Sequence, residues 1–369
     1  MTATVYFAEA GIGPRRENTL TKIRRLFDAA GIASCIGDGD LTAIKLHFGE
    51  WGNDTHISPV WVREVVDGVR TAGGNPFLTD TNTLYSGMRE NTVDHLATAL
   101  RHGFGYEVTG APLVIADGLR SGNWREVAIR KNYFEQVKIA GDILDAGSMI
   151  VLSHVKGHGM AGFGGAIKNL AMGCAPAAGK MAQHQGLCPV VDEDACEGCW
   201  ACVNACPKGA LEAGAETVEV VSTRCIGCGE CMTVCPTGAL DFDWANGLVP
   251  FMEMMTEYAL GAVQGKEGKV GYLNFLVDIT PDCDCCPWSD SRIVPDIGIL
   301  ASTDPVAIDA ASFDLVNARQ GIKESRLLGN HAPGEDKFKG VAPYTDGMRQ
   351  VRYGEEIGLG DADYELITI

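Results

Sequence analysis

Long apolar runs are missing from this sequence. No stretch reaches the ~18 consecutive apolar residues that a bilayer-spanning helix needs. The first ten residues carry neither a basic region nor a long apolar one, both of which a secretory signal requires. We therefore expect a cytoplasmic protein without membrane segments, whose cysteines serve metal and redox chemistry rather than disulfides.

Basic residues are scarce as well. The chain has 30 Lys and Arg against 48 Asp and Glu, a formal net charge of −18. Because phosphate contacts require clustered Lys and Arg, we expect no nucleic-acid partner. An acidic surface would suit a redox partner protein with a basic docking patch, or would only keep the protein in solution. A dinucleotide fingerprint is also absent, since Gly11-Ile12-Gly13 lacks the third glycine.

Cysteine, by contrast, is abundant. Eight of the 14 cysteines lie in two runs, residues 196–207 and 225–236, and each run has the form C-x2-C-x2-C-x3-C-P. This spacing is typical of proteins with two cubane iron–sulfur clusters, in which the fourth cysteine of each run ligates the other cluster. We predict two [4Fe-4S] clusters, one held by Cys196, Cys199, Cys202 and Cys235 and the other by Cys225, Cys228, Cys231 and Cys206.

A zinc site is the main alternative for these runs. Zinc also takes four thiolates, but usually from paired C-x2-C knuckles separated by a longer spacer. Glycines at 198, 227 and 229 permit the curved backbone that wraps a cluster and expose N–H groups toward sulfur. The duplicated four-cysteine spacing therefore favours iron–sulfur clusters over zinc.

The rest of the chain alternates between strand-like and helix-like segments, which predicts an α/β fold with a largely parallel, covered sheet. Strands are expected at 5–8, 41–47, 75–80, 113–117, 148–153, 271–277 and 296–301, and helices at 18–30, 59–72, 92–102, 251–264 and 306–318. Both cysteine runs end in a related Cys-Pro-x-Gly-Ala-Leu turn, which indicates an internal duplication. We predict an α/β domain in two parts, 1–187 and 243–369, with an inserted small α+β ferredoxin-like domain at 188–242.

Three further cysteines, Cys283, Cys285 and Cys286, crowd a short loop after a predicted strand. Ligands bind at the carboxyl ends of parallel strands. Cys283 and Cys285 could therefore chelate a soft metal or line a redox pocket, whereas the alternative is a polar loop with inert thiols. We favour a functional site, with a third metal or another ligand at the Cys283–Cys286 loop.

A glycine-rich segment, residues 153–170, leads from a predicted strand into a helix expected at Ala166. Glycine lets backbone N–H groups approach an anion, and a helix N-terminus adds positive potential. The segment therefore predicts a site for a small anionic ligand, a structural glycine turn being the alternative. Hydrogen-bond donors and proton-transfer groups would come from His154, Lys156, His158 and Lys168.

Two more segments, residues 45–50 and 80–85, also follow predicted strands. Because the carboxyl ends of parallel strands share one edge of a sheet, all four of these segments could converge there. The alternative for each is a solvated loop.

Residues 153–170, 281–290 and 294–312 resemble a known family. They are similar to the Fe–S-centre proteins of domain-of-unknown-function family 362, in the subgroup with a ferredoxin insertion, and the resemblance covers nearly the whole chain. It implies an α/β domain with two [4Fe-4S] clusters and no particular reaction. The residues carried over by motif are Lys156, Gly164, Gly165, Lys168, Asn169, Cys283, Cys285, Asp304 and Pro305. By analogy only, the Lys-Gly-His…Gly-Gly…Lys pattern is similar in style to the catalytic segment of nickel-pincer lactate racemases.

Three functional hypotheses follow. In the first, the protein is an oxidoreductase whose clusters exchange electrons with a small anionic substrate or a metal site in the α/β domain. In the second, it is a non-enzymatic electron carrier whose α/β domain docks a partner. In the third, Cys283, Cys285 and Cys286 hold a third metal in a metal-handling role. The first hypothesis assigns catalytic roles to Lys168, His154, His158, Lys156, Cys283 and Cys285.

Overall fold

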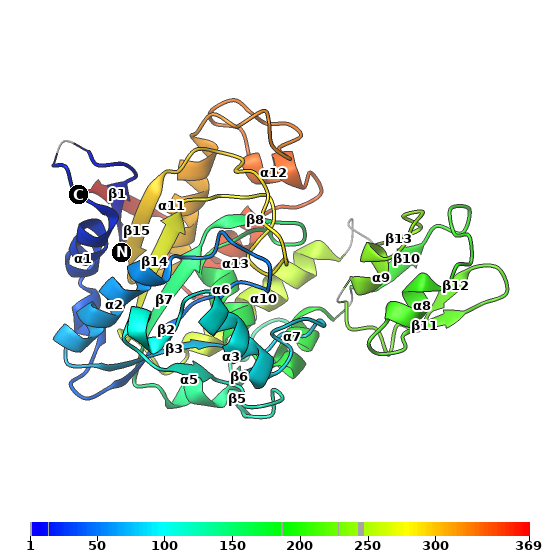
Figure 1. The fold of residues 1–369 in the computed structure, drawn as a ribbon, viewed down its shortest axis with the longest axis horizontal. Helices are drawn as coiled ribbons and strands as arrows, with labels where there is room; N and C mark the ends of the chain where they lie inside the picture. The colour runs from blue at the N-terminus through cyan, green and yellow to red at the C-terminus, as the bar shows by residue number, and fades with distance from the viewer. Residues whose placement is uncertain (1, 14, 186, 228, 243–246) are drawn as a thin grey trace.

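The computed structural model describes residues 2–13, 15–185, 187–227, 229–242 and 247–369. An eight-stranded sheet runs through its larger part, in the order β16-β1-β15-β14-β7-β2-β3-β4 (Figure 1). Within the described residues, β15 alone is antiparallel to both of its neighbours, so the sheet is mostly parallel as predicted. The strands are β1 (Ala3–Glu9), β2 (Leu41–Lys45), β3 (Asn75–Asp80), β4 (Leu113–Ile115), β7 (Ser148–His154), β14 (Val270–Leu276), β15 (Gly298–Ser302) and β16 (Tyr364–Thr368).

Helices cover both faces of this sheet. On one face lie α1 (Thr19–Ala29), α2 (Pro59–Thr71) and α3 (Thr92–Arg101); on the other lie α6 (Ala166–Gly173), α10 (Leu248–Val263), α11 (Pro305–Asn317) and α13 (Met348–Glu356). The central strand β7 shows why both faces are covered, because its side chains alternate between two cores. Met149 and Val151 pack into the first core, whereas Ile150 and Leu152 pack into the second. Strands buried on both faces read as continuous apolar runs, as β7 does.

Two helix starts follow from the local sequence. The side chain of Asn18 accepts a hydrogen bond from the backbone N–H of Thr21 and so caps α1. Asp304 accepts from the N–H groups of Val306 and Ala307 at the start of α11, where Pro305 occupies the first helical turn.

Several short elements have no counterpart among the sequence predictions. These are the paired strands β5 (Trp124–Ala128) with β6 (Gln136–Ala140) and β8 (Lys156–His158) with β9 (Gly162–Gly164), the edge strand β16, the 3-10 turn η1 (Ile32–Cys35), and the helices α4 (Tyr106–Thr109), α5 (Gly141–Asp145), α7 (Ala177–Gln183) and α12 (Lys337–Val341). Most are three to five residues long, and tertiary contacts rather than apolar periodicity stabilise elements of that length. Across the described parts of the chain, no helix combines the length and the apolar character needed to cross a membrane.

Residues 188–242, which we call the cysteine module, form a separate lobe (Figure 1). The lobe contains α8 (Ala201–Ala205), α9 (Glu230–Thr233) and two small antiparallel pairs: β10 (Pro189–Val191) with β13 (Leu240–Phe242), and β11 (Leu211–Ala213) with β12 (Val218–Val220). Because the first and last strands of the module pair with each other, the chain enters and leaves it at the same place. We call the remainder of the protein the α/β body.

Candidate functional site

Two cavities in the cysteine module are lined by cysteines of the two runs. One has about 320 Å³ of empty space, part of it open to solvent, and the other has about 350 Å³. The first is lined by Cys196, Cys199, Cys202 and Cys235, and the second by Cys206, Cys225 and Cys231. Each cavity thus combines three cysteines or more, with the fourth-position cysteine coming from the opposite run. Cys228, the remaining predicted ligand, lies outside the described residues.

The backbone of the two runs repeats the same turns. Left-handed φ angles occur at matching places in the runs, at Gly198 with Gly227 and Trp200 with Gly229, and again just after them, at Gly209 with Gly238. Backbone N–H groups also approach sulfur, from Ala210 to Cys206 Sγ at 3.2 Å and from Gly227 to Cys225 Sγ at 3.5 Å. Donors of this kind stabilise thiolates. The curved backbone, the sulfur-lined cavities and these donors fit a cubane cluster in each half.

The pKa values of two of these thiols shift in opposite directions. Burial would raise the pKa of Cys235, but hydrogen bonds from the Thr237 side chain and from nearby backbone N–H groups outweigh it and lower the value. Burial raises the pKa of Cys202. The thiolate is the form that binds metal, so Cys235 is the better prepared of the two.

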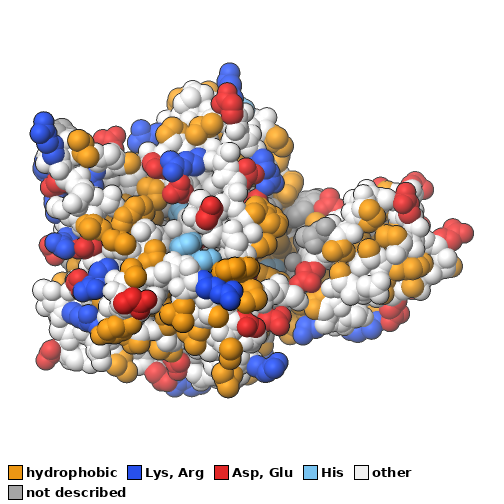
Figure 2. Space-filling model, viewed as in Figure 1, with side chains coloured by type: hydrophobic (Ala, Val, Ile, Leu, Met, Phe, Trp, Pro, Cys, Tyr) orange, Lys and Arg blue, Asp and Glu red, His pale blue; other side chains and the backbone are white. Residues whose placement is uncertain are grey.

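In the α/β body, the four strand-end segments meet at one edge of the sheet. The N–H of Glu50 donates to the carbonyl of Asp284 at 2.9 Å, and the Tyr85 hydroxyl donates to the carbonyl of Cys285 at 3.1 Å. Lys156 contacts the same loop from the glycine-rich segment. Figure 2 shows histidine side chains in a recess near the middle of the α/β body. We call this region, formed by residues 45–50, 80–89, 153–170 and 281–290, the strand-end site.

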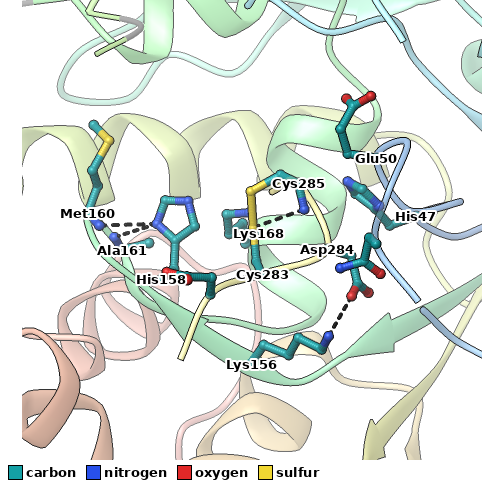
Figure 3. The surroundings of a disulfide bond; sticks show 12 residues. His47, Glu50, Lys156, His158, Met160, Ala161, Lys168, Cys283, Asp284 and Cys285 are labelled. Carbon is teal, nitrogen blue, oxygen red and sulfur yellow. Dashed lines mark hydrogen bonds and ion pairs between the residues drawn. A yellow bond between two sulfur atoms is a disulfide. The ribbon is translucent and has the colours of Figure 1, made fainter. Parts of the chain in front are cut away.

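A disulfide between Cys283 and Cys285 lies in this site (Figure 3). This bond departs from the expectation that the cysteines serve metal and redox chemistry rather than disulfides. Disulfides that cross-link distant parts of a fold are typical of secreted proteins, whereas here the two cysteines are only two positions apart in one loop. Cys286 does not take part in the bond.

Asp284, between the two bonded cysteines, is held by two of the predicted catalytic residues. His154 Nδ1 lies 2.9 Å from Asp284 Oδ2, and Lys156 Nζ donates to Asp284 Oδ1 at 2.6 Å. The other ring nitrogen of His154 lies 2.6 Å from the carbonyl oxygen of Val277. Burial would raise the pKa of Asp284, but His154 and Lys156 hold it well below its usual range. His154 and Lys156 therefore position the disulfide loop.

Lys168 and His158 face the disulfide itself (Figure 3). Lys168 Nζ donates to Cys283 Sγ at 3.7 Å, and burial lowers the pKa of Lys168 to about 8. Burial, with Lys168 and His184 nearby, holds the pKa of His158 well below its usual range. Its Nδ1 accepts hydrogen bonds from the N–H groups of Met160 and Ala161. Donor atoms of His158, Cys283 and Cys285 all lie within 4.8 Å of one another.

The start of α6 is not an open anion site as the sequence suggested. Asp309 Oδ1 accepts from the N–H of Ala166 at 2.7 Å, and its Oδ2 accepts from the N–H of Ile167 at 2.9 Å. Burial raises the pKa of Asp309 to about 6. The Asp309 carboxyl group thus accepts from the N–H groups that the sequence assigned to a ligand. In this segment, Lys168 and His158 are the groups that face the disulfide. No local sequence pattern signals this cap, because Asp309 is 143 residues away from Ala166.

A second group of polar side chains lies behind the site, and among them only Arg89 falls outside the segments that the sequence singled out. Arg89 Nε donates to Glu50 Oε2 at 3.1 Å, and Lys45 Nζ lies 3.0 Å from Asp80 Oδ1. All four side chains are buried. These pairs tie the ends of β2 and β3 together and fix the segments from which Glu50 and Tyr85 reach the disulfide loop.

The cysteine module meets the α/β body close to this site. The N–H of Ser86 donates to Glu230 Oε1, in α9, at 2.9 Å. On another side, a Cβ added at Gly227 would lie 2.9 Å from the carbonyl oxygen of Leu187 and 3.0 Å from that of His184. The half of the module that contains Cys225 and Cys231 therefore packs against the body.

Comparison with known proteins identifies the family. Residues 42–314 match the model described as "Domain of unknown function (DUF362)". The chain belongs to this family. A search of curated proteins gave no match. Twelve chains of solved structures match, among them the lactate racemase apoprotein from Thermoanaerobacterium thermosaccharolyticum, with 12% identity over 74% of this chain and a TM-score of 0.40. This chain spans about half of that structure, 51% of its length.

Proposed function

We propose that this member of the family is an iron–sulfur electron-transfer protein. Two [4Fe-4S] clusters in the cysteine module would exchange electrons with the strand-end site of the α/β body. The observation that carries the proposal is the pairing of cavities with cysteines: each cavity collects thiols from one run and the fourth-position thiol from the other. This crossed arrangement is typical of two-cluster ferredoxins.

The clusters would supply one-electron redox chemistry when bound. The chain's own contribution is to hold the thiolates and to surround them with N–H donors, such as those of Ala210 and Gly227. Hydrogen bonds to sulfur and burial set the potential of such clusters. The formal charge of −18 favours a redox partner protein with a basic docking patch.

The strand-end site supports an exchange of electrons within the protein rather than simple carriage. A lysine and a histidine with lowered pKa values, Lys168 and His158, face a disulfide at the edge of the sheet. Shifted pKa values and reactive sulfur in one recess are features of functional sites. A carrier that only docked partners would not need this group.

The test is iron and sulfide analysis with EPR on anaerobically purified protein. We expect eight irons and two interacting reduced cubanes after reduction, since each cubane holds four irons. Cys199→Ser and Cys231→Ser, one ligand from each set, should each remove one cluster. Cys35→Ser is the control, because Cys35 is a free cysteine buried in the α/β body, away from both runs. Zinc in place of iron, or full iron in both ligand variants, would refute the proposal.

A further inference from the structure

The Cys283–Cys285 disulfide is a poor structural cross-link. A disulfide stabilises a protein mainly by restricting the unfolded chain, and the effect grows with the length of the closed loop. Here only Asp284 separates the two cysteines. The contacts of Asp284 with His154 and Lys156 already hold the loop in place. A chemical role therefore accounts for the bond better than a structural one.

Resting on the proposed function, we propose that Cys283 and Cys285 form a redox-active pair that takes two electrons from the cysteine module. In this reaction the S–S bond breaks, two electrons and two protons are taken up, and both cysteines become thiols. The cysteines of the two runs would hold two cubanes, which would supply the two electrons that one disulfide requires, one from each cluster. A low-potential one-electron donor protein would recharge the module.

Cys283 is the sulfur prepared to carry negative charge. Lys168 Nζ lies 3.7 Å from its Sγ, and the backbone N–H of Cys285 donates to the same atom at 3.4 Å. A nearby cation and an N–H donor both favour a thiolate over a thiol. With a pKa of about 8, Lys168 can also give up a proton to this sulfur near neutral pH.

The loop can change oxidation state without changing shape. Its backbone is held by groups other than sulfur: Glu50 N–H donates to the Asp284 carbonyl, Tyr85 Oη–H donates to the Cys285 carbonyl, and Cys286 N–H donates to the Cys283 carbonyl. None of these contacts uses a sulfur atom, so opening the S–S bond does not require any of them to break. Small rearrangement favours fast electron transfer and a pair that reverses readily.

Two neighbouring residues connect the module to the disulfide loop. Ser86 N–H donates to Glu230 Oε1, and Glu230 precedes Cys231, one of the predicted cluster ligands. Tyr85 Oη–H donates to the carbonyl of Cys285 at 3.1 Å. The dipeptide Tyr85-Ser86 thus contacts the ligand helix of one cavity and the disulfide loop. This contact links the cavity with Cys206, Cys225 and Cys231 to the disulfide loop.

The geometry of His158 favours this redox role over a metal site. Because its Nδ1 accepts two backbone hydrogen bonds, the proton of the neutral ring lies on Nε2. Protonated Nε2 is a donor and has no lone pair for a metal. The disulfide in turn occupies both sulfurs.

The experiment follows the disulfide by mass. Anaerobic holoprotein is reduced with methyl viologen, a one-electron donor, then denatured in acid and alkylated. In the peptide with residues 283–286, we expect alkylation of Cys286 alone before reduction and of all three cysteines afterwards. The Cys199→Ser/Cys231→Ser double variant should open the bond at least tenfold more slowly with methyl viologen. Dithiothreitol, which acts on the bond directly, should open it in both proteins.

Each other result has a defined meaning. A bond that stays closed while EPR shows both clusters reduced would overturn this inference and leave the proposed function standing. Equal rates in the wild type and the double variant would also overturn it, since the electrons would then bypass the clusters. Thiols at 283 and 285 with a tightly held metal, lost in Cys283→Ser/Cys285→Ser, would replace the redox pair by a metal site. Protein without iron or a cubane EPR signal would refute the proposed function itself.

Discussion

The α/β body and the cysteine module are held together by different means. The body has two apolar cores, one on each face of its sheet. The module has a core of Leu211, Val218 and Leu240 with Cys202 and Cys231, and its strands are three residues long. A segment with so small a core usually needs disulfides or a metal to fold. The difference indicates that the body folds by hydrophobic burial, whereas the module would depend on the clusters that the proposed function assigns to its cysteines.

The largest expected effect comes from removing ligands on both sides of the module. Cys202→Ser with Cys231→Ser should abolish hydrogen-exchange protection across 188–242, because metal binding and folding are coupled in such segments. Protection of β7 and β14 in the body should remain within experimental error. Cys35→Ser, the control, should leave both regions protected, because Cys35 lies outside the module. If the module stays protected from exchange without iron, its small apolar core is enough to fold it, and the contrast with the body does not hold.

Next in size is the loss of the carboxylate that holds the disulfide loop. Asp284→Asn leaves the buried ammonium of Lys156 without its partner, and breaking a buried pair costs about 3 kcal/mol or more. Asp282→Asn is the matched control on the same loop, because its partner Arg326 is exposed and such a pair is worth about 1 kcal/mol or less. Urea unfolding of the body measures both. Equal losses in the two variants would contradict the positioning role of Asp284.

A smaller effect is expected where the module meets the body. Gly227→Ala places a Cβ at a φ of +65° and against the Leu187 and His184 carbonyls, whereas Gly238→Ala has a φ of +70° and open space. The left-handed backbone costs each variant about 1 kcal/mol. Gly227→Ala should lose more stability than Gly238→Ala, because its Cβ also meets the Leu187 and His184 carbonyl oxygens. Thermal unfolding of the holoprotein compares the two variants. Similar losses of stability would mean that Gly227 is not closely packed against the body.

The smallest effect concerns the reactivity of one thiol. After reduction of the disulfide, Lys168→Met should slow alkylation of Cys283 at pH 7 by roughly tenfold, since a nearby cation shifts a thiol pKa by about one unit. Lys168→Arg should retain most of the rate. Because Lys168 loses its proton as pH rises through about 8, the difference between wild type and Lys168→Met should shrink above that pH. A rate ratio that does not change between pH 7 and pH 9 would contradict the role of the ammonium.

The lowered pKa of Lys168 also makes the free energy of unfolding depend on pH. Its pKa is lowered by burial from 10.5 to about 8, so the folded protein binds fewer protons than the unfolded chain between these values. The contribution of Lys168 to stability is therefore greatest above pH 10.5 and is lost as pH falls toward 8. Lys168→Met should remove this slope from the unfolding free energy.

Much of the fold could be read from local patterns. The apolar run at 148–153 predicted the strand that became β7, and the helix predicted at 306–318 is α11. The edge strand β16 could not be predicted, because only its pairing with β1, across the whole length of the chain, makes it a strand. The reversed direction of β15 was equally hidden, since direction depends on the path of the intervening loop.

The candidate site divides in the same way. Spacing alone selected the eight cysteines of the two runs, because cluster ligands come from short loops whose geometry is local. Spacing also drew attention to Cys283, Cys285 and Lys168. It could not show that Lys156 and His154 would hold Asp284, or that Asp309 would fill the start of α6, because these partners lie more than 100 residues apart in the sequence.

The sequence by itself thus determined the α/β pattern, the family and the two sets of cysteines, all of which rest on the order and spacing of neighbouring residues. Only the tertiary structure decided which polar groups pair with one another inside the protein and which of them face the disulfide. Burial is the physical reason: a charged group out of water takes whatever partner the fold brings near, and that partner cannot be read from the chain. What is left facing Cys283, chiefly Lys168, is what the fold makes available for chemistry.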